Sequence, residues 1–247
     1  SKIFLLMLDW STAYYESKIW PIRTREGISK RIISFARDHG VEVYAWFVVL
    51  KHKPVDLFKE NDFMRNKTGG SILDNPPYIS NYTWLCPTSE NTRSFVVRIV
   101  RELTELDLDG IVLDYIRYPD IILPPGIRIE RPDYHLYRPE RDYCYCERCI
   151  KEFTTKQNFD PREIQYESDE YKIWSFWRAK NIRETVESIK EELKPHGMKL
   201  GAAVFPTPQI AFRYVLQKWD EWPLDFAAPM LYNVYWAENY GLSLIHI

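Results

Sequence analysis

The sequence lacks the features that mark membrane proteins and nucleic-acid-binding proteins. No segment approaches the roughly 18 consecutive apolar residues that a transmembrane helix needs. The 33 basic and 35 acidic residues give a formal net charge of -2, which argues against a surface for nucleic acid or anionic lipid. No signal peptide is visible. However, the chain runs from Ser1 straight into apolar residues and ends on GLSLIHI, so we expect both ends to be cut.

Motifs of phosphate and metal chemistry are also missing. No glycine-rich phosphate loop follows any apolar run, which counts against a nucleotide-binding doubly wound fold. The histidines form neither an H-x-H nor an H-E-x-x-H pattern, so a metal-dependent hydrolase has no support. The histidines are His39, His52, His135, His196 and His246.

Five apolar runs alternate with amphipathic segments and predict a parallel α/β fold. The runs lack strict polar alternation, as is typical of strands buried on both faces. They cover residues 2–9, 41–49, 109–116, 199–206 and 225–232. Helical spacing predicts helices over residues 28–36, 95–106 and 171–193. Gly40 and Gly197 each precede a strand and suit the left-handed residue that ends a helix.

The number of strands favours an incomplete TIM barrel. A closed (β/α)8 barrel needs eight strands in about 250 residues. Here residues 120–170 form a long insertion after the strand that bears Asp114, which leaves room for five. We therefore predict one (β/α) barrel domain over residues 1–247, truncated at both ends. The alternative is a complete doubly wound sheet of five strands.

The acidic residues fall into two groups according to whether they begin or end a predicted strand. Chemistry in parallel α/β folds lies at the carboxyl ends of the strands. Glu42, Asp109 and Asp225 open strands, whereas Asp9 and Asp114 close them. Asp9 and Asp114 are therefore the candidate catalytic residues. The alternative for Asp114 is a structural carboxylate that caps the strand or pairs with Arg117.

Aromatic residues are abundant, with 9 Trp, 17 Tyr and 12 Phe, and many follow the same strand ends. Such residues either fill a core or form stacking surfaces. One or two carboxylates, an arginine and a ring of aromatics suit a carbohydrate, which offers C–H faces for stacking and hydroxyls for hydrogen bonds. The candidate substrate-binding residues are Trp10, Tyr14, Trp46, Arg117, Tyr118, Tyr232 and Trp236.

The segment LDLDGIVLDYIRYP, preceded by WLCPTSENTRSFVVRIVRELTE, resembles the core of the glycosyl hydrolase-like family 10 proteins, in which a strand reads D-G-I-x-x-D-Y-x-R-Y-P. VEVYAWF, KLGAAVFP and LDFAAPMLY resemble neighbouring strands of that family, so the resemblance extends over residues 2–236. It implies a (β/α)8 barrel with Ser1 at the second strand. It also implies hydrolysis of O-glycosidic bonds in polysaccharides, cell-wall glycans included, outside the cytoplasm.

Most glycosidases use two carboxyl groups. We predict that Asp114 is the nucleophile or base, held ionised by Arg117. The partner acid is open, because GAAVFPT ends its strand without a carboxylate. Asp9 is preferred for its strand-end position, with Glu238, Asp120 or a residue outside this chain as alternatives. The non-enzymatic alternative is a carbohydrate-binding barrel that kept the aromatic surface and lost the acid.

Three of the four cysteines lie within YCYCERC in the insertion. These are Cys144, Cys146 and Cys149, and the fourth, Cys86, lies in WLCP before the helix that precedes Asp114. The C-x-x-C half of the pattern fits a metal site. We predict a structural zinc ion held by all four thiolates, with His135 as the alternative fourth ligand. A disulfide bond and reduced thiols are the other interpretations. No cofactor is needed for the predicted catalysis.

Overall fold

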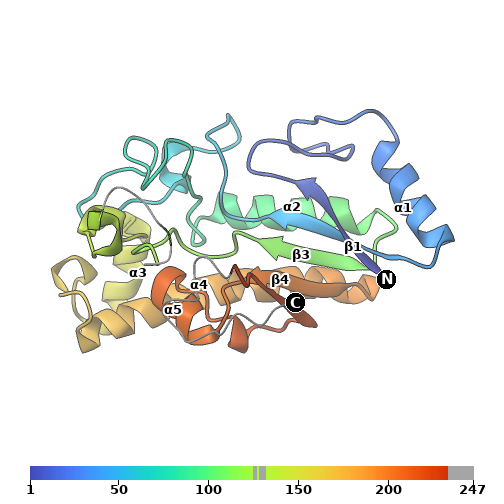
Figure 1. Ribbon diagram of the computed structural model, residues 1–247. Coiled ribbons are helices and arrows are strands. Elements are labelled where there is room, and N and C mark those ends of the chain that lie inside the picture. Colours follow the sequence, from blue (N-terminus) through green and yellow to red (C-terminus); the bar gives the residue numbers. More distant parts are fainter. Residues whose placement is uncertain (125–126, 128–131, 233–247) are drawn as a thin grey trace.

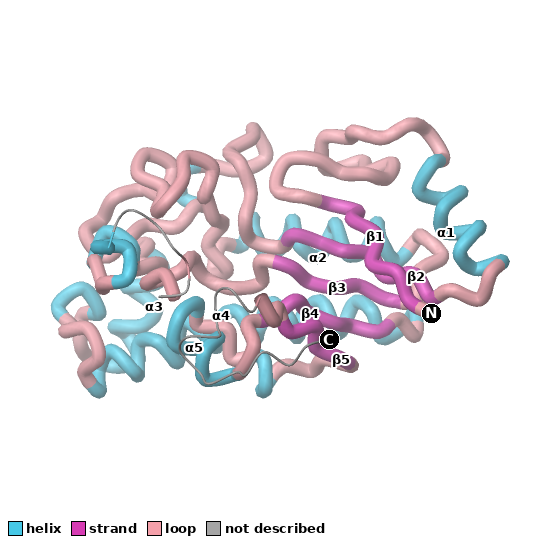
Figure 2. Tube along the Cα trace, in the orientation of Figure 1, coloured by secondary structure: helices cyan, strands magenta, loops and turns pink. Residues whose placement is uncertain are grey.

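The computed structural model describes residues 1–124, 127 and 132–232. Five parallel strands form one sheet in chain order, each paired with the next (Figure 2). They are β1 (Lys2–Leu8), β2 (Glu42–Val48), β3 (Gly110–Asp114), β4 (Lys199–Val204) and β5 (Phe226–Pro229). All five lie within the apolar runs, so the predicted strands are confirmed.

The sheet is curved like a barrel wall. Phe4 on β1 stacks against Phe226 on β5 with ring centroids 6.2 Å apart, although these are the two outer strands. Tyr44 on β2 fills the space between them, 5.7 Å from Phe4 and 5.2 Å from Phe226. A doubly wound sheet reverses its strand order and carries helices on both faces. Consecutive order and strong curvature therefore confirm the barrel-type fold as a partial TIM barrel of five strands.

Within the described residues, five α-helices lie between the strands in the sequence, with α3 inside the insertion. They are α1 (Ile28–Asp38), α2 (Glu90–Thr104), α3 (Glu147–Gln157), α4 (Asp169–Leu193) and α5 (Pro208–Val215). Short 3-10 helices cover Glu60–Asp62, Pro132–His135, Pro139–Arg141, Pro161–Glu163, Lys194–His196 and Trp219–Glu221. Ser89, Ser168 and Thr207 cap α2, α4 and α5 by accepting a backbone hydrogen bond. Gly40 and Gly197 adopt the expected left-handed conformation, with φ of 66° and 64°. The sequence did not predict α3 and α5.

One helix presents a different face from the expected one. The helical spacing that predicts this helix puts Ile28, Ile32, Phe35 and Ala36 on a common apolar face. The structure buries Ala36 together with Ile33 and leaves Phe35 66% exposed. Apolar residues at 28, 32, 33, 35 and 36 span more than one side of α1, and only one side can contact the sheet. Within the described residues, no helix combines the length and apolarity needed to cross a bilayer.

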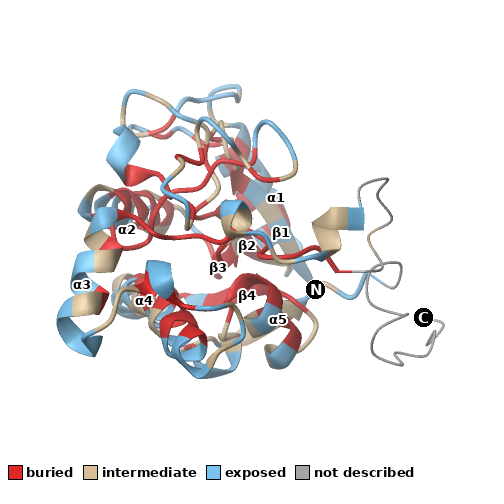
Figure 3. Ribbon diagram, turned by 90° about the vertical axis from the view of Figure 1, so that its left-hand side faces the viewer, coloured by how far each residue is buried: buried red, intermediate tan, exposed pale blue. Residues whose placement is uncertain are grey.

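The insertion lies beyond the carboxyl ends of the strands, beside the connection 49–89 between β2 and α2 (Figure 1). Backbone hydrogen bonds join the two segments: Tyr145 N donates to Arg65 O at 2.7 Å, and Lys67 N to Asp142 O at 3.0 Å. Figure 3 looks onto this end of the molecule and shows buried segments, in red, toward its centre. The insertion therefore covers one edge of the face where a site is expected.

Gly110, the first residue of β3, should tolerate no side chain. A Cβ there would collide with the backbone oxygen of Lys199 and lie 2.8 Å from Tyr44 Cε1. We expect Gly110→Ala to lower the free energy of unfolding by about 3 kcal/mol, because a paired backbone cannot move aside. Gly40→Ala, where a Cβ meets nothing within 4 Å, should cost only the left-handed conformation, about 1 kcal/mol. Equal losses in urea denaturation would contradict this.

Candidate active site

Asp114 is the last residue of β3 and lies at the carboxyl edge of the sheet. Its Oδ2 accepts a hydrogen bond from the Trp46 indole at 3.0 Å, and its Oδ1 accepts one from the Tyr115 backbone at 2.7 Å. Trp46 comes from the neighbouring strand β2, whose Val48 pairs with Asp114. Tyr115 has a left-handed φ of 49°, a conformation that non-glycine residues rarely adopt away from functional or tightly held positions. The carboxylate is thus held in one orientation.

The surroundings of Asp114 change its proton affinity. Burial raises the pKa of the Asp114 carboxyl, and the hydrogen bonds from Trp46 and Tyr115 partly oppose that rise. The positive charges of Arg117 and Lys51 oppose it further. Lys51 Nζ lies 5.0 Å from the centroid of the Tyr115 ring, and burial lowers the pKa of this lysine. A carboxyl group whose pKa is raised by burial is suited to act as a general acid or base.

A cavity of about 340 Å³ reaches Asp114. Its walls are mainly aromatic and aliphatic, and its charged groups are few, as in many small-molecule sites. It is lined by Trp46, Tyr78, Ile79, Tyr82, Asp114, Tyr115, Arg117, Asp120, Leu123, Pro124, Ile127, Phe205, Met230 and Tyr232. Asp114 and Asp120 are the carboxyl groups among these described lining residues.

Arg117 organises the wall of this cavity. It is buried, forms an ion pair with Asp120 at 3.2 Å, and donates to the Tyr82 hydroxyl at 3.3 Å. Its guanidinium lies 5.1 Å from the ring centroid of Trp84 and 5.2 Å from that of Phe205, at cation–π distance. The ion pair of Arg117 is therefore made with Asp120 and not with Asp114. Arg117 favours the ionised form of Asp114 only through its longer-range charge.

Asp120 is held firmly in the same cavity. Its Oδ2 accepts hydrogen bonds from Arg117 and from the Tyr82 hydroxyl, and its backbone oxygen accepts one from Tyr78 at 2.8 Å. Asp120 was one of the alternatives for the partner acid. The structure brings it to the wall of the cavity that contains Asp114.

Asp9, the residue that we preferred as the partner acid, forms local hydrogen bonds in a turn. Its Oδ1 accepts from the backbone N–H groups of Ser11 and Thr12, both at 2.7 Å, and its Oδ2 accepts from the Tyr14 hydroxyl at 2.9 Å. These bonds close the turn after β1, a common use of aspartate. Asp9 does not line the cavity among the described residues.

The predicted binding residues divide into three groups. Trp46, Arg117 and Tyr232 line the cavity with Asp114. Trp10, Tyr14 and Tyr118 do not, because Trp10 packs under Lys51, Tyr14 bonds Asp9, and Tyr118 is fully buried. Trp236 and Glu238 lie outside the described residues.

The candidate binding residues omitted four aromatic residues that line the cavity: Tyr78, Tyr82, Tyr115 and Phe205. Phe205 closes a predicted strand and could have been added on that ground. Tyr78 and Tyr82 lie in the connection 49–89, which has no helical or strand periodicity. The only available signal there was the cluster of aromatic residues in YISNYTW.

The four cysteines converge as predicted. The sulfur atoms of Cys86, Cys144, Cys146 and Cys149 all lie within 4.8 Å of one another and are buried. All four are free thiols in this structure. His135 is not part of the cluster, and its Nδ1 lies 3.1 Å from Leu123 O instead.

A family model described as "Putative glycosyl hydrolase domain" matches residues 11–244. The chain belongs to this family. The expectation of a glycosyl hydrolase-like domain is thereby confirmed at the level of the family. No curated protein sequence matches the chain.

Solved structures share the fold of this glycosyl hydrolase domain. The glycoside hydrolase domain of PgaB from Bordetella bronchiseptica is similar with a TM-score of 0.68 at 15% identity, over 93% of this chain and 64% of that one. The chain therefore spans about two thirds of that domain. Alpha-L-fucosidase isoenzyme 2 from Paenibacillus thiaminolyticus is similar with a TM-score of 0.53 at 20% identity, over 77% and 25% of the two chains. A hypothetical protein from Ruminiclostridium thermocellum gives 0.51 at 18%, over 81% and 82%.

Proposed function

We propose that this glycosyl hydrolase domain hydrolyses O-glycosidic bonds of a polysaccharide or cell-wall glycan, with Asp114 as nucleophile or base. The observation that carries the proposal is the aromatic cavity at the carboxyl ends of the strands, which holds Asp114 and Asp120 together. The flat rings of Trp46, Tyr82 and Tyr115 offer stacking surfaces to the C–H faces of a sugar. The resemblance of D-G-I-x-x-D-Y-x-R-Y-P to glycosyl hydrolase-like family 10 supports the same substrate class and a location outside the cytoplasm.

In this mechanism the burial of Asp114 has a purpose. A base or nucleophile with a raised pKa binds a proton or a sugar carbon more strongly once it is ionised. Trp46 and Tyr115 fix both carboxylate oxygens, so the attacking atom needs little reorganisation. The carboxyl groups act without a metal ion. The cysteine cluster takes no part, since zinc bound by four thiolates has no open coordination position.

We assign the partner carboxyl to Asp120 in place of Asp9, because Asp120 shares the cavity and Asp9 closes a turn. Asp120→Asn should lower kcat on a glycan substrate by about 10²-fold or more, the usual scale for a lost acid–base group. Asp9→Asn should leave kcat within a few-fold of wild type. Normal turnover by the Asp120 variant would remove this assignment and return the acid to a residue outside the described chain.

The acid limb of the pH–rate profile should respond to Trp46. The Trp46 hydrogen bond favours ionised Asp114, so its loss in Trp46→Phe should raise the pKa of Asp114 further. A base must be deprotonated to act, and activity is lost as pH falls through its pKa. The limb of kcat/KM in Trp46→Phe should therefore move to higher pH while an aromatic wall is kept. An unmoved limb would show that Asp114 does not control it.

A carbohydrate-binding barrel without catalysis is the second candidate. The engagement of Asp120 with Arg117 and Tyr82 favours it, since this carboxylate is already partnered. A panel of polysaccharides and peptidoglycan strands separates the two functions. Release of reducing ends supports the hydrolase, whereas retention on a glycan column without product supports the binding protein.

We also propose that a further strand pairs with the outer edge of β1. Phe4 and Leu6 on the outer strand β1 are 43% and 41% exposed, although their neighbours on β2 are largely buried. A further strand on β1 would cover these two side chains.

A further inference from the structure

The cysteine cluster links two segments that are far apart in the sequence. Cys86 lies at the end of the connection 49–89, and the other three cysteines lie at the start of α3 in the insertion. Sulfur–sulfur distances are 3.3 Å for Cys86–Cys144, 3.5 Å for Cys86–Cys149, 3.9 Å for Cys144–Cys149 and 2.7 Å for Cys144–Cys146. Tetrahedral zinc with bonds of about 2.3 Å requires sulfur atoms about 3.8 Å apart. Small rotations of these side chains would meet that requirement.

Hydrogen-bond donors surround the sulfur atoms. Thr88 Oγ1 lies 3.1 Å from both Cys86 Sγ and Cys149 Sγ, and Arg148 Nε donates to Thr88 at 3.1 Å. Two further donors beside the cluster, the Tyr118 hydroxyl and Arg148 Nη2, are buried and have no hydrogen-bond partner among the described residues. Both Tyr118 and Arg148 lie within electrostatic range of Cys86 and Cys149.

Unpartnered buried donors are costly, by about 1–3 kcal/mol each. Neutral thiols are weak acceptors, whereas zinc-bound thiolates are anionic acceptors. One zinc ion with four thiolates carries a net charge of about -2. The guanidinium of Arg148 offsets part of that charge, and Tyr118 supplies a hydroxyl donor. The surroundings therefore suit a buried anion better than four thiols.

The start of α3 favours thiolates as well. Cys146 is the N-cap of this 11-residue helix, and Cys149 lies in its first turn. The positive end of the helix dipole stabilises negative charge at these positions.

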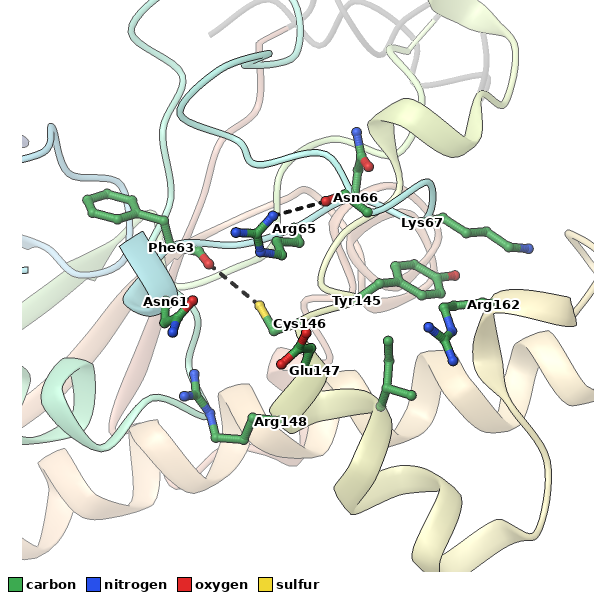
Figure 4. Close-up of a pocket in the computed structure, with 12 residues that line it drawn as sticks. Asn61, Phe63, Arg65, Asn66, Lys67, Tyr145, Cys146, Glu147, Arg148 and Arg162 are labelled. Atoms are coloured by element: carbon green, nitrogen blue, oxygen red, sulfur yellow. Dashed lines mark hydrogen bonds between the residues drawn. The ribbon is translucent and has the colours of Figure 1, made fainter. Parts of the chain in front are cut away.

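A cavity gives the cluster an access route. It has a volume of about 440 Å³ and is larger than the one at Asp114, but it lies away from the strand ends. In Figure 4, Cys146 points from its wall toward Phe63, whose carbonyl lies 3.5 Å from the sulfur. Arg148 lines the same wall. A hydrated ion in this cavity would be next to one of the four sulfur atoms.

We propose that the four thiolates bind one structural zinc ion and that this ion fixes the wall of the cavity at Asp114. Tyr82, which lines that cavity, and Trp84, which packs under Arg117, lie four and two residues before Cys86. Tyr118 directly follows Arg117, is buried, and lies within electrostatic range of Cys86, Cys144 and Cys149. The ion thus ties together the segment 82–88, the loop after β3 and the insertion. Zinc binding does not depend on the proposed hydrolase activity. Only the description of the cavity at Asp114 as an active site rests on that proposed function.

The first test measures metal content. Untagged protein, purified under reducing conditions without added zinc, should contain about one zinc ion per chain, and the double variant Cys86→Ser, Cys149→Ser should contain almost none. Cobalt should replace zinc and give the strong visible absorption of a tetrathiolate site. Thr88→Val and Tyr118→Phe keep all four ligands and should retain the ion with affinity about 10-fold to 100-fold lower. Folded wild type with less than half an equivalent, or equal zinc in the double variant, would overturn the site.

The second test measures how well the cavity wall is protected from amide hydrogen exchange, which does not require catalytic activity. Removal of zinc by a chelator should speed amide hydrogen exchange in residues 82–88 and 115–120 by at least 10-fold. Exchange in β1 and β2 should change little, and added zinc should restore protection. Unchanged exchange in 82–88 would overturn the link to the cavity even if zinc is bound. If zinc-loaded protein protects residues 82–88 from exchange but hydrolyses no glycan, the result would count against the proposed function and not against the zinc site.

Discussion

Asp114→Asn is expected to lower kcat on a cleavable glycan by about 10²–10⁴-fold, the range for loss of a catalytic acid–base group. Asparagine has nearly the same shape and can still accept the Trp46 hydrogen bond, so the cavity and sugar binding should persist. The amide can neither attack a sugar carbon nor take a proton from water. Initial rates of reducing-end release and the dissociation constant for an oligosaccharide should be measured on the same preparations.

Asp109→Asn is the matched control, because Asp109 precedes the same strand at its opposite end. Its Oδ2 accepts from Val43 N at 2.7 Å, and the residue lies at the amino edge of the sheet. Its removal should leave kcat close to wild type. Turnover in Asp114→Asn comparable with wild type would exclude Asp114 as nucleophile or base. Loss in both variants, with normal circular dichroism, would point to a general effect of β3.

The five strands and the position of Asp114 at a strand end were predictable, because each depends on a short stretch of sequence. Five apolar runs of the right length specify five strands wherever they pack, and the last polar residue of a run marks its carboxyl end. The convergence of Cys86 with the insertion was predictable from connectivity. In a parallel barrel, the connection before a helix and the loop after the next strand meet at the same edge.

The carboxylate that shares the cavity with Asp114 was not predictable in this way. Asp9 and Asp120 look alike in sequence, since each follows a strand within a few residues. What separates them is tertiary: Ser11 and Thr12 turn back onto Asp9, whereas Arg117 and Tyr82 draw Asp120 to the cavity wall. Tyr82 comes from a long connection whose path no local pattern specifies. The sequence led us to expect that Arg117 holds Asp114 ionised. In the structure the Arg117 side chain is directed to Asp120 instead.

Arg178→Met should produce the largest loss of stability. Arg178 on α4 is fully buried and pairs with Asp142 of the insertion at 2.6 Å. The hydroxyls of Tyr145, Tyr137 and Tyr171 also donate to Asp142, at 2.8, 3.1 and 3.1 Å. Removing the arginine leaves a buried carboxylate without its counter-charge, which costs about 3–5 kcal/mol. The midpoint and extrapolated free energy of urea unfolding should be measured for both proteins.

Arg183→Met is the matched control, because it makes the same change one and a half turns further along the same helix. Arg183 is solvent-exposed and pairs with Glu187 at 2.7 Å across one helical turn, so the urea midpoint should change little. Since Asp142 lies two residues before Cys144, the Arg178 variant should also expose the insertion to limited proteolysis. Equal stability of the two variants would mean that this ion pair does not hold the insertion in place, and that the link between the insertion and Cys86 in the cysteine cluster does. A Cys86→Ser variant added to Arg178→Met would then release the insertion where neither change alone does.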